Sequence, residues 1–365
     1  QILHAMRASH TSSPLKGLAT GGLPKLSTMQ NFVKNSRRTL LEAPVAGNTV
    51  AELKEWCNKH AAVPDSDDTA FVLNSDFGED GAFKIMITSK RLLQNLEKQP
   101  QNAHGNLFLA VDATYKLNLE KRPVIPLGTV DNDRRYHHVA MCLMSSTAEN
   151  HTHFEFACSS VFAGLKDVIG LSLSGLHVYF MNDNAACIRN GIDEALAAMD
   201  EDARPTSTTQ LTCYAHLKSP MGALTKTGRT KLNNDATYEK VAKDVQLLHE
   251  VPAGLSAFVL DAFQHLFVSK WVTNGEREMT TWFSEFWTRK IRWSRACIAP
   301  GLPHHNDHLE RANAKLKAAV NRRKFSFAVF INQLVKYVES ESVGEEGVAW
   351  PSEPSLTAHD WREAQ

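Results

Sequence analysis

The sequence lacks several features that would mark whole classes of protein. Its six cysteines are scattered and form no Cys-x-x-Cys pair, which disfavours a disulfide framework or a four-ligand zinc module and indicates a reducing compartment. No apolar run reaches the roughly 18 residues that a membrane helix requires. Basic and acidic residues balance at 40 each, so any surface for nucleic acid must come from local clustering.

What is present fits a globular protein with a sizeable core. The chain has 365 residues, of which 43% are apolar and 22% are charged, as is typical of folded domains. This length predicts about two domains of roughly 150 residues each. Because the sequence begins with Gln1 and not with Met, we expect a fragment of a longer protein.

The first part of the chain divides into an arm and a short lead-in. Residues 1–41 contain basic side chains but no Asp or Glu, which predicts a basic flexible arm over 1–47, either a linker or a segment that contacts nucleic acid. An organelle transit peptide is a weaker alternative because arginines are few. Residues 48–104 predict a small α/β lead-in, with a capping box at Thr49 and Glu52. Its expected elements are a helix to about His60, strands at 69–74 and 83–88, and a helix from Ser89 to about Leu96.

Residues 105–216 predict a ribonuclease-H-like α/β core with a mixed, five-stranded sheet. Three strands with short connections indicate an antiparallel meander, after which helices alternate with two more strands. In this βββαβαβ order the first and fourth strands lie side by side, and right-handed crossovers support that topology. The expected strands span 107–117, 123–130, 136–145, 176–182 and 208–214, and the expected helices span 150–168 and 184–199.

The rest of the chain is predicted to be mainly helical. Residues 217–300 form an expected helical insertion, followed by closing helices at 301–340 and an acidic tail at 341–365. The tryptophans of the insertion are expected in its core, although one of them could stack on an unpaired base. These residues are Trp271, Trp282, Trp287 and Trp293.

Three acidic residues occupy informative settings. Asp112 lies inside the apolar run LFLAVDATYKLNL (107–119), Asp183 ends the run GLHVYFMND (175–183), and Glu310 lies in the helical stretch HHNDHLERANAKLK (304–317). A buried carboxylate costs several kcal/mol unless it is paired or bound to a cation. Two acids on strands and one on a helix could converge on Mg²⁺, and two such ions can hold a phosphodiester for in-line attack.

Each acid also has a structural alternative. Asp112 is a surface residue if its strand ends early, and Asp183 is a helix N-cap if the helix begins at once. Glu310 could form a capping box with Asp307. Against that alternative, Glu310 begins a polar stripe with Asn313, Lys317 and Asn321, opposite a buried stripe of Leu309, Ala312, Leu316 and Val320.

Other polar residues near these acids are candidates for supporting roles. Cys213 and His216 lack zinc partners at the usual spacing, so we expect them to pack beside the acids and position a group there. A metal site at His304, His305 and His308 is possible, but solvated loop histidines are the simpler interpretation. A basic run follows Glu310 and is either a solvated helix face or a contact to the DNA backbone. It contains Arg311, Lys315, Lys317, Arg322, Arg323 and Lys324.

At these positions the chain resembles the Mutator-like element transposases, over residues 83–320. The family motif Asp-x-Thr-(Phe/Tyr)-Lys corresponds to DATYK at 112–116, and its second acid lies in MNDNAACIRNGIDEAL at 181–196. The family's Cys-x-x-His corresponds to Cys213 and His216, and its motif Thr-Asn-Asn-x-x-Glu-x-x-Asn to HNDHLERAN at 305–313. The segment ITSKRLLQNL (87–96) resembles the one that precedes the catalytic core in this family.

The resemblance implies a ribonuclease-H-like fold, an acid triad and two bound Mg²⁺ or Mn²⁺ ions. The triad would be Asp112, Asp183 and Glu310, with Lys116 and Lys317 contacting phosphates. The implied activity is cleavage of DNA and strand transfer at element ends, in the nucleus, and a homodimer would hold two ends together. In the third motif His305 and Asp307 depart from the family pattern, and zinc-binding segments expected on either side of the core are absent from this sequence.

Two other functions share the same residues. A transposase-derived transcription regulator would use the fold as a scaffold and would bind DNA or protein without a metal, since fold alone does not fix function. A nuclease of the same fold would hydrolyse DNA without joining it to a target. The sequence contains no feature that separates this nuclease from a transposase.

Overall fold

The computed structural model describes most of the chain from Thr49 onward. The described ranges are 49–99, 106–218, 222–252, 257–288, 292–299, 302–303, 305–320 and 325–348. All described residues belong to one compact unit, Gly47–Gln365. The predicted arm at 1–47 therefore lies outside the described residues, as does most of the predicted tail. Among the described helices, none combines the length and apolarity needed to cross a membrane.

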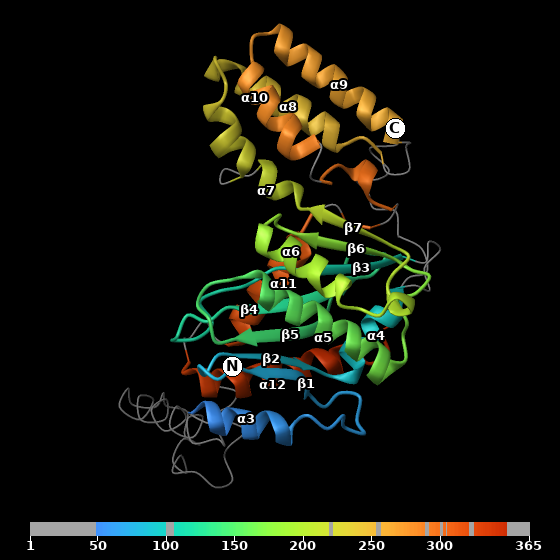
Figure 1. Cartoon of the computed structure of the whole chain (residues 1–365), viewed down its shortest axis with the longest axis vertical. Coiled ribbons are helices and arrows are strands. Elements are labelled where there is room, and N and C mark those ends of the chain that lie inside the picture. Colours follow the sequence, from blue (N-terminus) through green and yellow to red (C-terminus); the bar gives the residue numbers. More distant parts are fainter. Residues whose placement is uncertain are drawn as a thin grey trace, which may run out of the picture. The chain divides into compact units, whose positions relative to one another are not determined.

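The fold is α/β and is built on one mixed sheet of seven strands, in the order β1-β2-β5-β4-β3-β6-β7 (Figure 1). Strands β3, β6 and β7 run parallel to one another, and the remaining neighbours are antiparallel. The strands are β1 (Phe71–Phe77), β2 (Phe83–Thr88), β3 (Asn106–Val111), β4 (Val124–Val130), β5 (Tyr136–Met144), β6 (His177–Asn182) and β7 (Ser207–Thr212).

The predicted count of five strands is wrong because the lead-in does not form a separate layer. Its second strand, β2, pairs antiparallel with β5, for example at Ile85 and Leu143. Strand β1 then pairs with β2 and forms the edge of the sheet. Ile85, Met86 and Ile87 are completely buried, so the lead-in contributes apolar side chains to the same core as the central strands.

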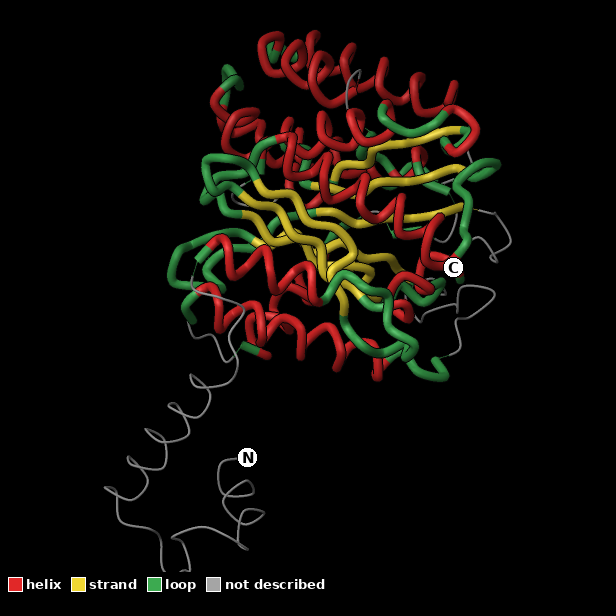
Figure 2. The backbone as a smooth tube through the Cα atoms, turned by 60° about the horizontal axis from the view of Figure 1, so that its bottom comes forward, coloured by secondary structure: helices red, strands yellow, loops and turns green. Residues whose placement is uncertain are grey.

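The sheet lies between helices, as the tube in Figure 2 shows. Helices α5 and α6 pack closely against each other on one face; a Cβ at Gly191 of α6 would lie only 2.5 Å from the carbonyl oxygen of His151. Helices α11 and α12 pack on the other face, through ring contacts of His308 with Tyr136 and of Tyr337 with His138. The helices around the sheet are α3 (Val50–Lys59), α4 (Lys90–Glu97), α5 (His151–Ile169), α6 (Ala186–Ala197), α11 (Asp307–Ala319) and α12 (Phe327–Gly344).

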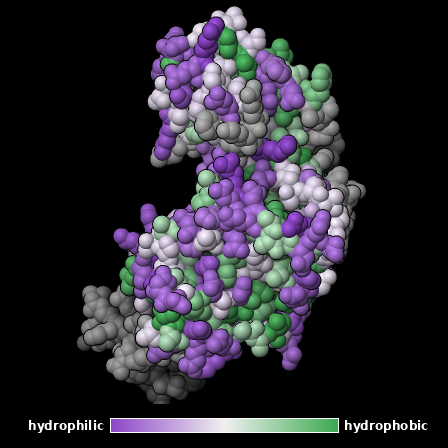
Figure 3. Space-filling model, viewed as in Figure 1, coloured by the Kyte–Doolittle hydropathy of each residue, from purple (hydrophilic) through white to green (hydrophobic). Residues whose placement is uncertain are grey.

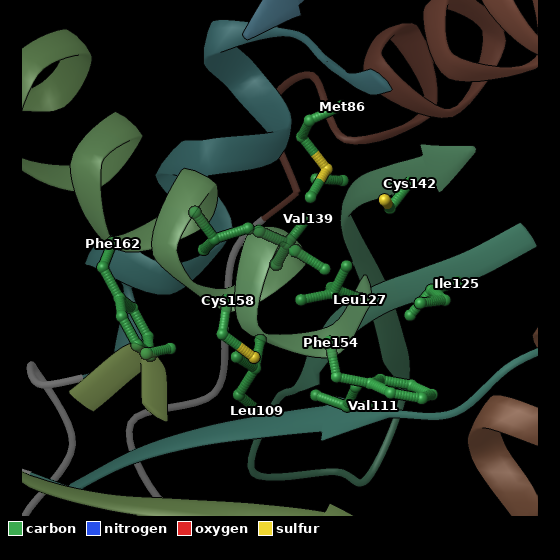
Figure 4. Close-up of a cluster of buried hydrophobic side chains, with 14 of the residues drawn as sticks. Met86, Leu109, Val111, Ile125, Leu127, Val139, Cys142, Phe154, Cys158 and Phe162 are labelled. Atoms are coloured by element: carbon green, nitrogen blue, oxygen red, sulfur yellow. The ribbon is translucent and has the colours of Figure 1, made fainter. Parts of the chain in front are cut away.

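Strand β3 is buried on both faces because its alternate residues join different clusters. Leu109 and Val111 pack with Phe154 and Cys158 of α5 in the main core (Figure 4). Phe108 and Ala110 belong to a second cluster that includes Leu309 of α11. Each fully buried side chain of this kind stabilises the fold by about 1.5–3 kcal/mol, so both faces hold the strand in place.

The described part of residues 217–300 is mainly helical, with turns between the helices and an isolated bridge at Arg292. Trp271, Trp287 and Trp293 are buried in its apolar cluster, whereas Trp282 is half-buried. The chain returns beside the sheet where the Thr212 N–H donates to the Arg292 carbonyl over 2.8 Å. The helices of this region are α7 (Tyr214–Lys218), α8 (Tyr238–His249), α9 (Ala257–Thr273) and α10 (Arg277–Phe283). Short 3₁₀ or π turns lie between or after them, at Leu224–Gly228, Asp235–Thr237, Ser284–Thr288 and Arg295–Cys297. A further 3₁₀ turn, Glu201–Ala203, lies earlier in the chain, between α6 and β7. Figure 3 shows polar residues spread over much of the visible face, with apolar side chains between them.

Two further boundaries differ from the sequence-based expectation. The strand predicted at 107–117 ends at Val111; beyond it Thr114 makes a single bridge to Val124, and Lys116 has a left-handed φ of 69°. The acidic tail predicted from 341 begins inside α12, which continues to Gly344. Near its end Glu341 pairs with Lys315 at 2.8 Å, and the C-cap residue Glu345 pairs with His137 at 2.8 Å. The capping box at Thr49 and Glu52 is confirmed.

Candidate functional site

The register of the two central parallel strands places Asp112 and Asp183 side by side. Strand β3 pairs with β6 up to Ala110 and Met181, so the same offset brings Asp112 opposite Asp183 just beyond the paired ends. Adjacent strands are about 4.8 Å apart. Both acids therefore lie at the carboxyl edge of the parallel strands, where open α/β sheets bind ligands. Asp112 is the first residue after its strand and not an interior strand residue, which corrects the sequence-based placement.

Side-chain alternation explains why a third acid is near. Phe108 and Ala110 on β3 and Met181 on β6 lie in the cluster that contains Leu309 of α11. Asp112 and Asp183 continue that alternation toward the α11 side. Glu310 lies in the first turn of α11 and is exposed. Its charge contributes to the electrostatic environment of Asp112, so the three predicted acids share one neighbourhood.

Backbone donors hold the two aspartates in place. The Ala113 N–H donates to Asp112 Oδ1 and the Ala185 N–H donates to Asp183 Oδ1, each over 2.8 Å. Between the latter pair, Asn184 has a left-handed φ of 73°, a conformation that Asn tolerates better than most residues. The N-cap of α6 is Ala185, so Asp183 is not the helix cap. Each aspartate thus retains one oxygen that accepts no backbone hydrogen bond among the described residues.

The site carries more negative charge than its surroundings neutralise. Burial, and then the nearby charges of Asp183, Glu149 and Glu310, raise the pKa of Asp112 to about 7, although the Ala113 N–H opposes the shift. Burial and Asp183 also raise the pKa of Glu149. Strongly shifted acids at the carboxyl end of a sheet are typical of functional sites.

Glu149 is a fourth acid that the sequence interpretation missed. It precedes Asn150, the N-cap of α5, and its Oε1 accepts a hydrogen bond from the Tyr115 hydroxyl. Its Oε2 lies 4.0 Å from Cys187 Sγ, at the start of α6. The segment around it has no strand or helix periodicity and matches no motif, so nothing local in the sequence distinguishes Glu149 from a surface residue.

The start of α11 is held by the cysteine of the predicted Cys-x-x-His pair. The Cys213 N–H donates to the Asn182 carbonyl over 3.0 Å, and the Asn306 N–H donates to Cys213 Sγ over 3.1 Å. Cys213 therefore connects the residue before Asp183 to the N-cap of the Glu310 helix. Burial raises the pKa of this thiol to about 11, which keeps it protonated at neutral pH. His216 lies one helical turn farther along and is half-buried.

The capping-box alternative for Glu310 is wrong, because the N-cap of α11 is Asn306 and no side chain caps this helix. Leu309, Ala312, Leu316 and Val320 are buried as predicted. The polar stripe is less regular than expected, since Asn313 is buried and Lys317 is half-buried, while Asn321 lies outside the described residues.

The histidines before Glu310 are not simple solvated residues. His308 is buried between the rings of Phe108 and Tyr136, and burial lowers its pKa to about 3. His305 is half-buried, with Nδ1 3.4 Å from Asp307. His304 lies outside the described residues. The buried aromatic setting of His308 explains why the solvated interpretation fails for it.

The predicted DNA-contacting residues are only partly described. Lys116 and Arg311 are exposed, and neither has a hydrogen-bond or ion-pair partner among the described residues. Lys315 is also exposed, but its Nζ pairs with Glu341 at 2.8 Å, which diverts its charge toward α12. The predicted basic residues Arg322, Arg323 and Lys324 lie outside the described part of the chain.

The donor chemistry of the site fits a hard divalent cation, since carboxylate oxygens are the ligands that Mg²⁺ and Mn²⁺ prefer. A cation would also offset the repulsion that raises the pKa of Asp112. Within the described ranges, however, no three His, Cys, Asp or Glu side chains are grouped closely enough to hold a metal ion. Binding by Asp112, Asp183 and Glu310 therefore requires their side chains to move together.

No protein-family model and no curated protein matches this chain in sequence.

Proposed function

We propose that this chain is the catalytic core of a Mutator-like element transposase. It would cleave DNA phosphodiester bonds and transfer strands at element ends. The observation that supports this most directly is the shared neighbourhood of Asp112, Asp183 and Glu310 at the carboxyl edge of β3 and β6. The motif resemblance and the chemistry of the three acids both lead to the same reaction.

A ribonuclease-H-like core is part of this proposal. Five neighbouring strands in the sheet run β5-β4-β3-β6-β7, which are the third, second, first, fourth and fifth strands after the lead-in. The first three are antiparallel and the last two are parallel to the first. Helix α5 connects β5 to β6, and helix α6 connects the parallel strands β6 and β7, as the expected βββαβαβ order requires. On this basis β1 and β2 are an extension of that core.

The proposal assigns a different role to each group of residues at the site. Asp112, Asp183 and Glu310 would hold two Mg²⁺ or Mn²⁺ ions, and ions so bound lower the pKa of an attacking water and stabilise the leaving oxygen. Lys116 and Arg311 are exposed beside the acids and would contact the flanking phosphates, which position the duplex without reading its sequence. Lys317, half-buried on α11, is a further phosphate contact. Cys213 would hold the start of α11, and thereby Glu310, at its distance from Asp183.

The test is nicking of supercoiled plasmid DNA in the presence of Mn²⁺ or Mg²⁺. We expect nicking by the wild-type chain that stops when EDTA is added and falls by about 10³-fold or more in Asp112→Ala. Asp202→Ala is the matched control, because Asp202 is an exposed acid remote from the motif residues. Equal nicking by Asp112→Ala and wild type would contradict the proposal.

A scaffold role without catalysis is the second candidate. It is favoured by the absence of a grouped set of metal ligands within the described ranges. This function predicts DNA or protein binding that does not change with Asp112→Ala or with EDTA. Joining of a labelled element end to a target plasmid separates a transposase from a nuclease of the same fold, since the nuclease would only hydrolyse the DNA.

A further inference from the structure

Glu149 contacts the loop that follows Asp112 and the first turn of α6, the helix that follows Asp183. Its Oε1 accepts the Tyr115 hydroxyl, three residues beyond Asp112. Its Oε2 lies 4.0 Å from the sulfur of Cys187, four residues beyond Asp183. One carboxylate therefore lies against two segments that are far apart in sequence but flank the same pair of acids.

The loop after Asp112 depends on such a contact at its tip. Thr114 is anchored to Val124 by two backbone hydrogen bonds of 2.8 and 3.0 Å, and Leu117 is buried. Between these anchors Tyr115 and Lys116 are exposed, and Lys116 has a φ of 69°. A left-handed non-glycine residue persists only when its surroundings hold it. The hydrogen bond from Tyr115 to Glu149 is the side-chain contact that ties this exposed tip to another element.

The hydrogen bond between Tyr115 and Glu149 is expected to be strong and to persist at neutral pH. A hydroxyl that donates to a carboxylate forms a charge-assisted hydrogen bond, which is stronger than a neutral one. Burial and the hydrogen bond to Glu149 raise the pKa of Tyr115 well above its ordinary value, so the phenol keeps its proton throughout the neutral range. Glu149 lies between β5, which ends at Met144, and Asn150, the N-cap of α5. Its segment is therefore anchored by regular structure at both ends.

We propose that Glu149 is a positioning residue for the acidic site. Its two oxygens contact the Asp112 loop through Tyr115 and the first turn of α6, which follows Asp183, through Cys187, and thereby set the separation of Asp112 and Asp183. This role rests on the proposed nuclease chemistry, because the separation matters only if both acids act on one phosphodiester. A displacement of about 1 Å at a reacting centre can cost about 10²-fold in rate.

Substitutions that differ in hydrogen bonding separate positioning from other roles. Glu149→Ala removes both contacts, and we expect kcat for nicking to fall about 10- to 100-fold, with KM for DNA changed less than about twofold. Glu149→Gln keeps an oxygen that accepts the Tyr115 hydroxyl, so it should restore most of the rate. Tyr115→Phe combined with Glu149→Ala should be no slower than Glu149→Ala alone, because both remove the same bond. Glu79→Ala, at an exposed acid in the β1–β2 turn, is the matched control.

A second measurement is independent of any activity. Hydrogen exchange over 113–117 and 184–188 should be faster in Glu149→Ala than in wild type or Glu149→Gln, and unchanged in Glu79→Ala. Unchanged exchange in both segments, or a Glu149→Gln variant as slow as Glu149→Ala, would overturn the positioning role. If the wild-type chain nicks no DNA, the proposed function fails, while the exchange comparison still decides whether Glu149 holds the two segments.

Discussion

Glu276 in the helical region and Asp112 at the sheet edge are both withdrawn from water, but their surroundings differ in kind. Glu276 is only 1% exposed, and its carboxylate accepts the N–H groups of Asn233 and Asn234 at 2.6 and 3.2 Å and the Thr237 hydroxyl at 3.0 Å. Asp112 accepts one backbone N–H and faces three other acids. Glu276 is thus a structural acid whose charge is satisfied within the fold, whereas Asp112 has fewer donors, and under the proposed function its charge would be offset by a cation.

The two settings give a criterion for separating structural carboxylates from those proposed to act in catalysis. Burial alone does not distinguish them, because a buried acid with enough donors stabilises the loop that provides those donors. What distinguishes the Asp112 site is like charge gathered near the carboxyl ends of two parallel strands. Under the proposed function, this unfavourable arrangement would be retained for catalysis and compensated by the rest of the fold.

The largest expected effect is a loss of stability at the structural acid. Glu276→Ala leaves two backbone N–H groups and a hydroxyl without their acceptor, so we expect the free energy of unfolding to fall by about 2–4 kcal/mol. Urea unfolding followed by tryptophan fluorescence measures this, since three of the tryptophans lie in the same apolar cluster. Asp112→Ala should lower the free energy of unfolding far less under the same conditions. Equal losses in the two variants would show that the two acids do not differ in their contribution to stability.

A smaller effect on stability, of opposite sign, is expected at Asp112, the acid proposed to act in catalysis. The pKa of Asp112 is raised to about 7, so between about pH 4 and pH 7 the folded state binds more protons than the unfolded state. Ionisation therefore destabilises the fold as pH rises through this window. Asp112→Asn cannot ionise, so it should be more stable than wild type at pH 8, by about 1–3 kcal/mol, and no more stable at pH 4.

Thermal unfolding of wild type and Asp112→Asn at these two pH values measures the difference, and Asp202→Asn serves as the control because Asp202 is exposed. Added Mn²⁺ should raise the melting temperature of wild type at pH 8 and leave that of Asp112→Asn nearly unchanged, if the proposed cation binds the folded state. A stability difference that does not depend on pH would mean that the charge of Asp112 is already neutralised within the fold.

The contrast also shows how much of the site could be predicted from sequence. Strand periodicity is local, so it correctly predicted β4, β5 and β6 to within a residue or two, and the motif residues identified Asp112 and Asp183. The pairing of β2 with β5 joins residues such as Lys84 and Met144, and no local pattern specifies that partner. Glu149 was missed for the same reason, because its contact with Tyr115 spans 34 residues and leaves no trace in periodicity.

The smallest expected effect concerns the backbone of the site. Lys116 has a φ of 69° and Lys121 has a φ of 59°, and both side chains are exposed. Glycine adopts this conformation without the steric cost that other residues carry, so Lys116→Gly and Lys121→Gly should each raise the free energy of unfolding by no more than about 1 kcal/mol. Both lysines lie in the connection between β3 and β4, but Lys116 is four residues beyond Asp112 and Lys121 is nine residues beyond it. We therefore expect only Lys116→Gly to weaken DNA binding and slow nicking. Each variant loses one positive charge and relieves one left-handed backbone conformation. An equal loss of DNA affinity in both variants would therefore mean that Lys116 acts through general electrostatic attraction and does not contact DNA at the site.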